Sequence, residues 1–232
     1  MFIDVDMECV RNAMNPENIY TIIADARAEL RNSVNDKDYF IAIKAQEHAK
    51  RAIIVAAVQG HTVFLFGPTG HGKTMLVKAG ASLGVPVKEA HLCPCGNYSH
   101  PIKTCRCTSA KIRSHWKKLR PTIEAADICA EVSTVPATML LSKTNGTTLA
   151  NAKDQLQRAK LPPQITQVDL SEPSKRILKQ AIIELALSPK SVTKILDVAR
   201  SITALMGNTN IDESSLCEAI QYSNERVLNK LL

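Results

Sequence analysis

Apolar residues recur at spacings of three and four along the first sixty residues, which is the period of a helix with one buried face. This pattern predicts helices over Glu17–Arg31 and Asp38–Gln59. Gly60 follows the second helix and supplies the usual C-terminal stop. The short β-branched and aromatic run Thr62–Phe66 then predicts a buried strand.

The C-terminal part of the chain has the clearest helix boundaries. Serine and aspartate caps, together with proline and glycine breakers, predict helices over 149–159, from Ser171 to Leu185, from Ser188 to Gly207, and a final one after Asp212. The middle of the chain, roughly residues 85–165, is irregular by comparison. It contains one predicted strand, Ile128–Val132.

Directly after the first predicted strand, the chain matches the phosphate-binding pattern G-x-x-x-x-G-K-[ST]. The match consists of Gly67, Pro68, Thr69, Gly70, His71, Gly72, Lys73 and Thr74. Its glycines let successive backbone N–H groups face the phosphates, while Lys73 adds a positive charge and the Thr74 hydroxyl ligates Mg²⁺. The helix expected over 73–83 directs its N-terminus at the same anion. The sequence therefore predicts binding of ATP with Mg²⁺.

Hydrolysis of ATP needs more than this loop. P-loop ATPases hold Mg²⁺ and polarise water with an acid that ends a second strand, the Walker B element. No run of four apolar residues followed by an acidic pair occurs in the chain. Glu131 and Asp169 are poor substitutes, so the sequence leaves open whether ATP is hydrolysed.

The positive charge of the chain is concentrated in one block. The formal net charge is +7, and residues 101–120 hold seven basic residues and no acidic one. Such a block predicts a local basic surface. On a helix, its members fall on two overlapping faces, formed by Lys111, Arg113, Trp116, Lys117, Lys118 and Arg120. This surface fits the backbone of DNA, with Trp116 stacking on a base. It fits equally a solvated face with Trp116 folded onto the core, and a contact between subunits of a ring.

Four of the seven cysteines lie within 15 residues of one another, at Cys93, Cys95, Cys105 and Cys107. Four thiolates in one short segment suit a tetrahedral Zn²⁺ site, although the C-x-C spacing is tighter than the usual C-x₂-C. The alternative is four reduced cysteines without a metal. The remaining cysteines are expected to be buried apolar residues, at Cys9, Cys129 and Cys217.

The sequence also excludes several classes of protein. At 45% hydrophobic and 22% charged residues, it is typical of a globular fold and not of a disordered or fibrous chain. The longest uninterrupted apolar run, Ala52–Val58, is far shorter than a membrane span. The acidic N-terminus differs from the basic start of a signal peptide. We therefore expect a cytoplasmic protein without membrane contact.

Three segments together resemble the AAA+ ATPases of the magnesium-chelatase family, in its ComM/YifB branch. They are Ala45–Ala52 leading into the phosphate loop, the cysteine segment beginning Cys93-Pro94-Cys95-Gly96, and the helical region from Leu187 to Tyr222. The resemblance covers about residues 40–225 in the family's order. It implies an α/β fold with a P-loop NTPase (AAA+) core and a C-terminal all-helical lid. The expected domains are an N-terminal helical extension (1–36), the core with the cysteine cluster (37–146) and the lid (147–232).

The chain also departs from this branch. The branch carries a Lon-like N-terminal domain that is not recognisable here, so the chain resembles a truncated member. The family's Walker B stretch is replaced by only Gly84–His91, which predicts a reduced core. The segment matching the arginine finger, Glu124–Asp127, contains no arginine. The sensor-2 arginine of the lid is matched by Lys190, which the resemblance places at the nucleotide.

For the branch as a whole, the resemblance implies a hexameric, ATP-driven motor on DNA that acts in recombination during natural transformation. For this chain we expect an ATP-binding protein of that type, with at most a weak ATPase acting on DNA. Three alternatives stay open. One is a regulatory nucleotide binder or remnant without hydrolysis. Another is an ATPase whose site a partner or an acid such as Asp127 completes, and the third is an ATPase subunit of a metal chelatase.

Overall fold

The computed structural model describes residues 38–135, 137–140, 146–160 and 170–230. The expected helix Glu17–Arg31, the extension 1–36, Cys9 and Asp169 lie outside these residues. Tyr39–Leu232 forms one compact unit, which contains the sheet and all the helices described. The domain boundary expected at 146/147 stays a prediction.

Three short parallel strands form the sheet, in the order β2-β1-β3. They are β1 (Val63–Phe66), β2 (Val87–Ala90) and β3 (Ile128–Glu131). The central strand β1 pairs with both neighbours, so that Val63 lies opposite Val87 on one side and Ile128 on the other. Parallel strands need crossover connections, which helices provide in this chain. All three carboxyl ends therefore meet at one edge of the sheet.

The helices of the described residues are α3 (Tyr39–Ala42), α4 (Glu47–Gln59), α5 (Lys73–Ser82), α6 (Ser109–Ala125), α7 (Ala137–Leu140), α8 (Leu149–Arg158), α9 (Glu172–Leu185), α10 (Pro189–Met206), α11 (Glu213–Gln221) and α12 (Asn224–Lys230). The predicted helices corresponding to α5 and α8–α11 are confirmed, as are the strands β1 and β3. The side chains of Ser171, Ser188 and Asp212 cap their helices as expected. The chain is thus a mixed α/β protein with a small parallel sheet.

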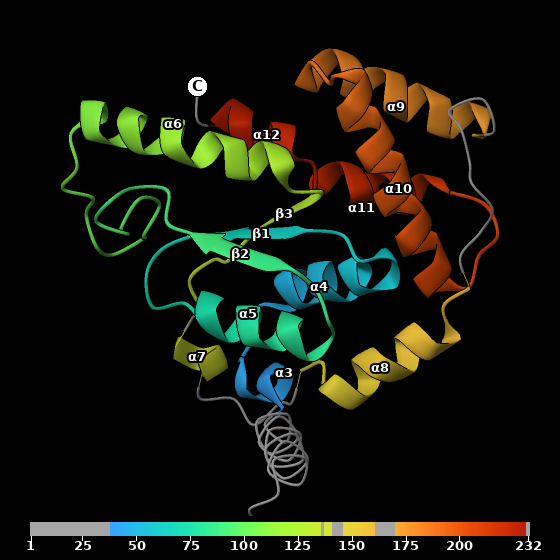
Figure 1. The fold of residues 1–232 in the computed structure, drawn as a ribbon, viewed down its shortest axis with the longest axis horizontal. Coiled ribbons are helices and arrows are strands. Elements are labelled where there is room, and N and C mark those ends of the chain that lie inside the picture. Colours follow the sequence, from blue (N-terminus) through green and yellow to red (C-terminus); the bar gives the residue numbers. More distant parts are fainter. Residues whose placement is uncertain (1–37, 136, 141–145, 161–169, 231–232) are drawn as a thin grey trace, which may run out of the picture. The chain divides into compact units, whose positions relative to one another are not determined.

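The two faces of the sheet are covered by different helices. Val63 and Leu65 of β1 belong to the large core that α4, α5 and α10 also form, whereas Phe64 and Phe66 pack in a second cluster with Ile123 of α6. This alternation follows from the period of two along a strand. Figure 1 shows α6 and α12 on one side of the sheet and α4 and α5 on the other. Both faces of β1 are therefore buried, as is usual for a central parallel strand.

The single helix expected over Asp38–Gln59 is wrong. The chain forms the short helix α3, leaves helical geometry at Ile43, and begins α4 only at Glu47. Ala45 and Gln46 both have positive φ angles, 57° and 60°. The Gln46 side chain donates a hydrogen bond to the carbonyl oxygen of Ser133 at 2.6 Å. This long-range contact stabilises a break that the local helical period does not show.

The region predicted to be irregular contains regular elements. Strand β2 extends the sheet, and its outer side chains are exposed. Helix α6 carries five of the seven basic residues of the block and shows one buried residue, Ile123. The final helix expected after Asp212 is in fact two helices, α11 and α12. The exposed surfaces of β2 and α6 explain why the apolar pattern did not predict them.

Polar contacts join the C-terminal helices to the helices that cover the two faces of the sheet. Arg51 of α4 and Glu218 of α11 form a salt bridge with Nε–Oε1 3.0 Å. The Nζ atom of Lys194 on α10 donates to the last carbonyl oxygens of α6, with the shortest distance, 2.7 Å, to Ala126. A cation at this position also suits the negative end of the α6 dipole. Whether the helices after residue 146 act as a separate lid stays a prediction.

Two of the three cysteines expected to be buried can be located. Cys129 of β3 is buried, and burial raises the pKa of its thiol to about 12. Cys217 of α11 is exposed, so its expected burial is wrong. Within the described ranges, none of the helices has the length and apolar character that a membrane crossing requires.

Candidate nucleotide-binding site

The phosphate loop (residues 67–74) connects the carboxyl end of β1 to the N-terminus of α5. Three of its glycines have positive φ: Gly67 at 150°, Gly70 at 84° and Gly72 at 90°. A Cβ atom on Gly67 would collide with the carbonyl oxygen of Val132. The loop therefore needs glycine at this position both for its backbone conformation and for space.

Lys73 is buried inside the phosphate loop, with 4% of its surface exposed. Its Nζ atom donates to the carbonyl oxygens of Gly67 at 3.0 Å and Pro68 at 2.6 Å. Burial lowers the pKa of Lys73, and the nearby carboxylate of Glu89 opposes this shift. A buried cation with only carbonyl acceptors is a strong attractor for an anion such as a phosphate.

A histidine of the phosphate loop supplies a further polar group at this position. The Nε2 atom of His71 is buried and, among the described residues, has no hydrogen-bond partner. Its ring lies 5.3 Å from the ring of His100. Burial lowers the pKa of His71, and the neighbouring charges of His100 and Lys73 lower it further. A phosphate oxygen would satisfy this nitrogen.

The Thr74 hydroxyl, expected to ligate Mg²⁺, donates a hydrogen bond of 2.8 Å to Oε1 of Glu89. Glu89 lies on β2, the strand that the sequence did not predict. The signal that would have identified it is the alternation of Val85, Val87 and Glu89 after the glycine Gly84. Hydroxyl and carboxylate oxygens are suitable ligands for Mg²⁺.

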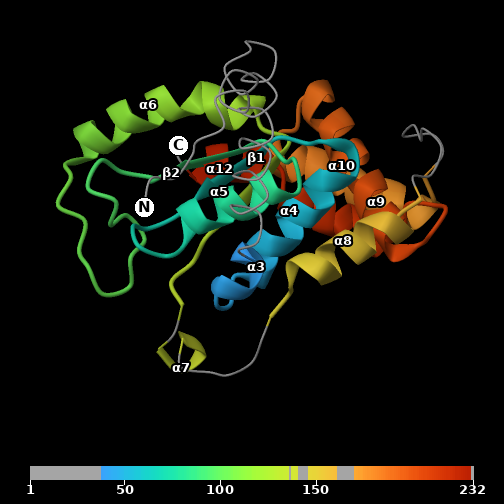
Figure 2. The same ribbon diagram turned by 60° about the horizontal axis from the view of Figure 1, so that its bottom comes forward.

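The cysteine loop (residues 91–108) lies directly against the phosphate loop. The backbone N–H of Thr69 donates to the carbonyl oxygen of Gly96 at 3.0 Å. The Nδ1 atom of His91 lies 3.2 Å from the carbonyl oxygen of Gly67. Figure 2 shows the two loops side by side at the same edge of the sheet. The cysteine loop thus forms one wall of the phosphate loop, a role that the sequence pattern did not indicate.

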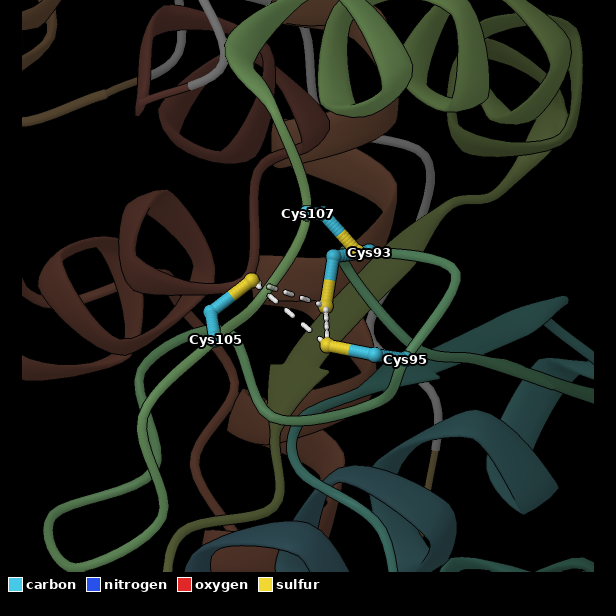
Figure 3. A group of neighbouring side chains, drawn as sticks. All are labelled: Cys93, Cys95, Cys105 and Cys107. Carbon is cyan, nitrogen blue, oxygen red and sulfur yellow. Dashed lines mark hydrogen bonds between the residues drawn. The ribbon is translucent and has the colours of Figure 1, made fainter.

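The four clustered cysteines converge. Their sulfur atoms all lie within 4.8 Å of one another. The Sγ atoms of Cys93 and Cys95 are 3.3 Å apart, and that of Cys105 lies 3.6 Å from each of them. Figure 3 shows these three sulfurs pointing toward one another, with Cys107 beside Cys93. Four thiolates on one tetrahedral Zn²⁺ lie about 3.8 Å apart, so the cluster has the spacing of a metal site.

Backbone amides of the loop favour the thiolate form of one of the four cysteines. The N–H groups of Asn97 and Arg106 lower the pKa of Cys95 to about 6, whereas desolvation and the neighbouring thiols raise the pKa of Cys105 to about 12. A bound cation would favour the thiolate form of all four. The N–H of Tyr98 donates to Sγ of Cys93 at 3.2 Å. Such hydrogen bonds to sulfur are typical of the outer shell of a metal centre. Zinc or an iron–sulfur cluster are the groups that four such ligands accept.

A cavity of about 470 Å³ opens where β1 and β3 end. Its lining includes Phe66, Glu131, His48 and Arg226, and the strained residues Ala45 and Gln46 at the start of α4. Ligands of open parallel sheets bind at the carboxyl ends of the strands. The phosphate loop begins directly after Phe66, although none of its own residues lines the cavity.

Comparison with known protein families shows to which family the chain belongs. The sequence model "Magnesium chelatase, subunit ChlI" matches residues 39–92, and "Magnesium chelatase, subunit ChlI C-terminal" matches residues 142–223. Together they span more than half of the chain. The chain belongs to the magnesium-chelatase family. The first match includes the phosphate loop and supports nucleotide binding with Mg²⁺. A search of curated proteins gave no match.

The two magnesium-chelatase matches leave residues 93–141 between them. This segment contains all four clustered cysteines and the basic helix α6. The basic side chains of α6 are exposed, namely Lys111, Arg113, Lys117, Lys118 and Arg120. Trp116 is half-buried instead: its indole nitrogen donates to the carbonyl oxygen of Leu92 at 2.6 Å, and its ring meets Tyr98 edge-on at 5.6 Å. These contacts favour the structural role for Trp116 over stacking on a base.

Two further sequence-based candidates lie away from the phosphate loop. Lys190 lines a cavity with Arg120 and Glu124, and no residue of the phosphate loop lines that cavity. Its contact with nucleotide stays a prediction. Asp127, considered as the missing acid, precedes β3 and accepts a hydrogen bond from the N–H of Thr62. It lies at the amino end of the sheet, opposite the phosphate loop, so the hypothesis that it completes the site is wrong.

Proposed function

We propose that the chain binds ATP with Mg²⁺ in the phosphate loop, as a ComM-type member of the magnesium-chelatase family. The observation that carries this proposal is the buried Lys73 ammonium, enclosed by glycine backbone at the N-terminus of α5. The unpartnered nitrogen of His71 supports it as well. Bound Mg²⁺ supplies charge neutralisation for the phosphates, and the Thr74 hydroxyl is placed to hold it.

Calorimetric titration of the protein with ATP and Mg²⁺ tests this proposal. We expect one site per chain, and a loss of about 100-fold in affinity for Lys73→Ala, because a buried charge contact contributes about 3 kcal/mol. Lys78→Ala is the matched control: Lys78 is exposed on the same helix and should leave the affinity unchanged. Equal affinities of the wild-type protein and Lys73→Ala would contradict nucleotide binding at this loop.

We further propose that the cysteine cluster holds Zn²⁺ as a structural ion. The convergence of the sulfurs of Cys93, Cys95 and Cys105, and the amides directed at them, supports this proposal. Elemental analysis of protein purified without chelators should give one zinc per chain. A Cys95→Ser variant should contain less. A folded protein with no bound metal would leave the four cysteines as reduced thiols.

The hydrolysis step distinguishes the weak ATPase from the regulatory nucleotide binder. The arginine-finger segment contains no arginine, and Lys194 holds its last residue, Asp127, at 3.3 Å. We therefore favour a protein that binds ATP tightly and turns it over slowly. Steady-state turnover on the order of one per second, lost in Lys73→Ala, would identify an ATPase instead. The same result would favour the metal-chelatase subunit over the regulatory binder.

We also propose that α6 contacts the DNA backbone. Five exposed basic residues lie along this helix, and no acidic residue occurs in it up to Arg120. Binding measured by fluorescence anisotropy should weaken steeply with salt. Replacing Lys117, Lys118 and Arg120 by alanine should lower the affinity, whereas Lys179→Ala on the distant helix α9 should not. Unchanged binding would exclude this surface. Loss of oligomers in the same triple variant would point instead to a contact between subunits of a ring.

A further inference from the structure

The carboxyl end of β2 brings a carboxylate to the phosphate loop, although the sequence shows no Walker B element. Oε1 of Glu89 lies 2.8 Å from Oγ1 of Thr74, the first hydroxyl of α5. Both residues are exposed, so the pair is accessible from solvent. Fifteen residues separate them in the chain, and the pairing of β2 with β1 brings them together.

The direction of the Glu89 side chain follows from the packing of β2. Val87 and Glu89 point to the same face of the sheet because side chains alternate along a strand. Val87 packs on α5 at Gly80, where any Cβ atom would collide with it. The close approach of strand and helix at Gly80 therefore directs Glu89 at the N-terminal end of α5.

The other acids of the described strands do not reach this position. Glu131 ends β3 on the same face as Cys129, which packs against α6 and α12 rather than α5. Asp127 lies at the opposite end of the sheet and is occupied by Thr62 and Lys194. Glu89 is thus the strand carboxylate directed at the phosphate loop within the described residues.

The spacing of the two oxygens also fits a divalent cation. Mg²⁺ keeps its ligands at about 2.05 Å in an octahedron, so two adjacent ligands lie about 2.9 Å apart. The 2.8 Å between Glu89 and Thr74 is close to this distance. Rotation of the hydroxyl hydrogen away from Glu89 would leave lone pairs of both oxygens facing one ion.

We propose that Glu89 and Thr74 together form the Mg²⁺ site of this protein. A strand that directly neighbours β1 then supplies the acid that a separate Walker B strand would otherwise carry. The Mg²⁺ site rests on the nucleotide-binding function proposed for the phosphate loop, and it extends that function to a specific metal ligand. The proposed site binds the Mg²⁺ ion that accompanies the nucleotide, and it requires no ATP hydrolysis.

The test compares ATP affinity in excess Mg²⁺ and in EDTA for the wild-type protein, Glu89→Gln and Glu184→Gln. Glu184 is an exposed glutamate on α9 and serves as the matched control. We expect Mg²⁺ to strengthen ATP binding by the wild-type protein and by Glu184→Gln. Glu89→Gln should lose about 10-fold in affinity with Mg²⁺, the usual cost of altering a metal shell. In EDTA it should bind ATP at least as well as the wild-type protein, because a carboxylate that repels phosphate is gone.

A second readout monitors the ion itself. Electron paramagnetic resonance of Mn²⁺ with ATP should show fewer bound ions for Glu89→Gln than for Glu184→Gln at equal nucleotide occupancy. A Glu89→Gln variant that keeps the full Mg²⁺ effect overturns the Glu89 site but leaves nucleotide binding intact. An equal loss of affinity with Mg²⁺ and with EDTA overturns it too. A wild-type protein that binds no ATP in either condition overturns both proposals.

Discussion

The phosphate loop and the cysteine loop lie side by side at the same edge of the sheet, yet they are stabilised differently. The phosphate loop is held by its own backbone, with glycines in positive-φ conformations and Lys73 bonded to carbonyl oxygens of the loop. The cysteine loop has no helix or strand between β2 and α6. It is held by converging thiols and by contacts from His91 and Trp116.

The two kinds of stabilisation make the phosphate loop depend on the cysteine loop. The phosphate loop is encoded by eight consecutive residues, whereas the cysteine loop joins thiols from two segments and a side chain of α6, and under the zinc proposal also depends on a bound metal ion. Thr69 and Gly67 both form hydrogen bonds with the cysteine loop. Loss of the metal should therefore also disturb the nucleotide site. Substitutions in each loop, together with removal of the metal, show which contacts stabilise the phosphate loop and which stabilise the cysteine loop.

Gly67→Ala should disrupt the phosphate loop most strongly. The new Cβ atom would meet the carbonyl oxygen of Val132, which belongs to backbone and cannot rotate away. We expect a loss of about 3 kcal/mol in the free energy of unfolding, measured with urea. Gly70→Ala is the control, because it has a positive φ but open space, and it should cost about 1 kcal/mol. Equal costs for both variants would contradict the close approach at Gly67.

Removal of the metal should unfold the cysteine loop while the sheet remains. Trp116 is the only tryptophan of the chain, and it packs on this loop, so its fluorescence reports on the loop directly. Treatment with a strong chelator should shift its emission to longer wavelength and weaken ATP binding about 10-fold. Far-ultraviolet circular dichroism should change little. Unchanged fluorescence and ATP affinity would show that the loop needs no metal.

The sequence predicted the elements that depend on neighbouring residues, and it missed the features that depend on contacts between distant residues. The phosphate loop, β1 and α10 follow from short patterns, such as the Ser188 cap and the Gly207 stop. The break at Ala45 depends on a hydrogen bond from Gln46 to Ser133. Glu89 was missed because its exposed edge strand offers only the short alternation of Val85 and Val87 as an apolar pattern. The convergence of the cysteines was predicted, but their contact with the phosphate loop was not.

Gly96→Ala should weaken the connection between the two loops. A Cβ atom at Gly96 would collide with Oγ1 of Thr69, and the φ of 75° adds strain. We expect a cost of about 2 kcal/mol in unfolding free energy. Thr69→Ala removes the colliding oxygen, so the double variant should recover about 1 kcal/mol of this cost. Strict additivity of the two substitutions would contradict the close approach of Thr69 Oγ1 to Gly96.

Trp116→Phe should have the smallest effect. Phenylalanine keeps most of the apolar ring but cannot donate the hydrogen bond to Leu92. The free energy of unfolding should fall by about 1 kcal/mol, the usual cost of an unpaired carbonyl. DNA affinity should stay unchanged, because the indole faces the cysteine loop. A large loss of DNA binding would restore the hypothesis that Trp116 stacks on a base.

Nucleotide binding at the phosphate loop can be measured by energy transfer from Trp116 to an ATP analogue that carries a methylanthraniloyl fluorophore. Trp116 lies against the cysteine loop, which forms a wall of the phosphate loop, so a nucleotide bound there should be close to this donor. We predict transfer that saturates at one analogue per chain, is displaced by ATP and is lost in Lys73→Ala. The absence of transfer in folded, metal-loaded protein would contradict nucleotide binding at this loop.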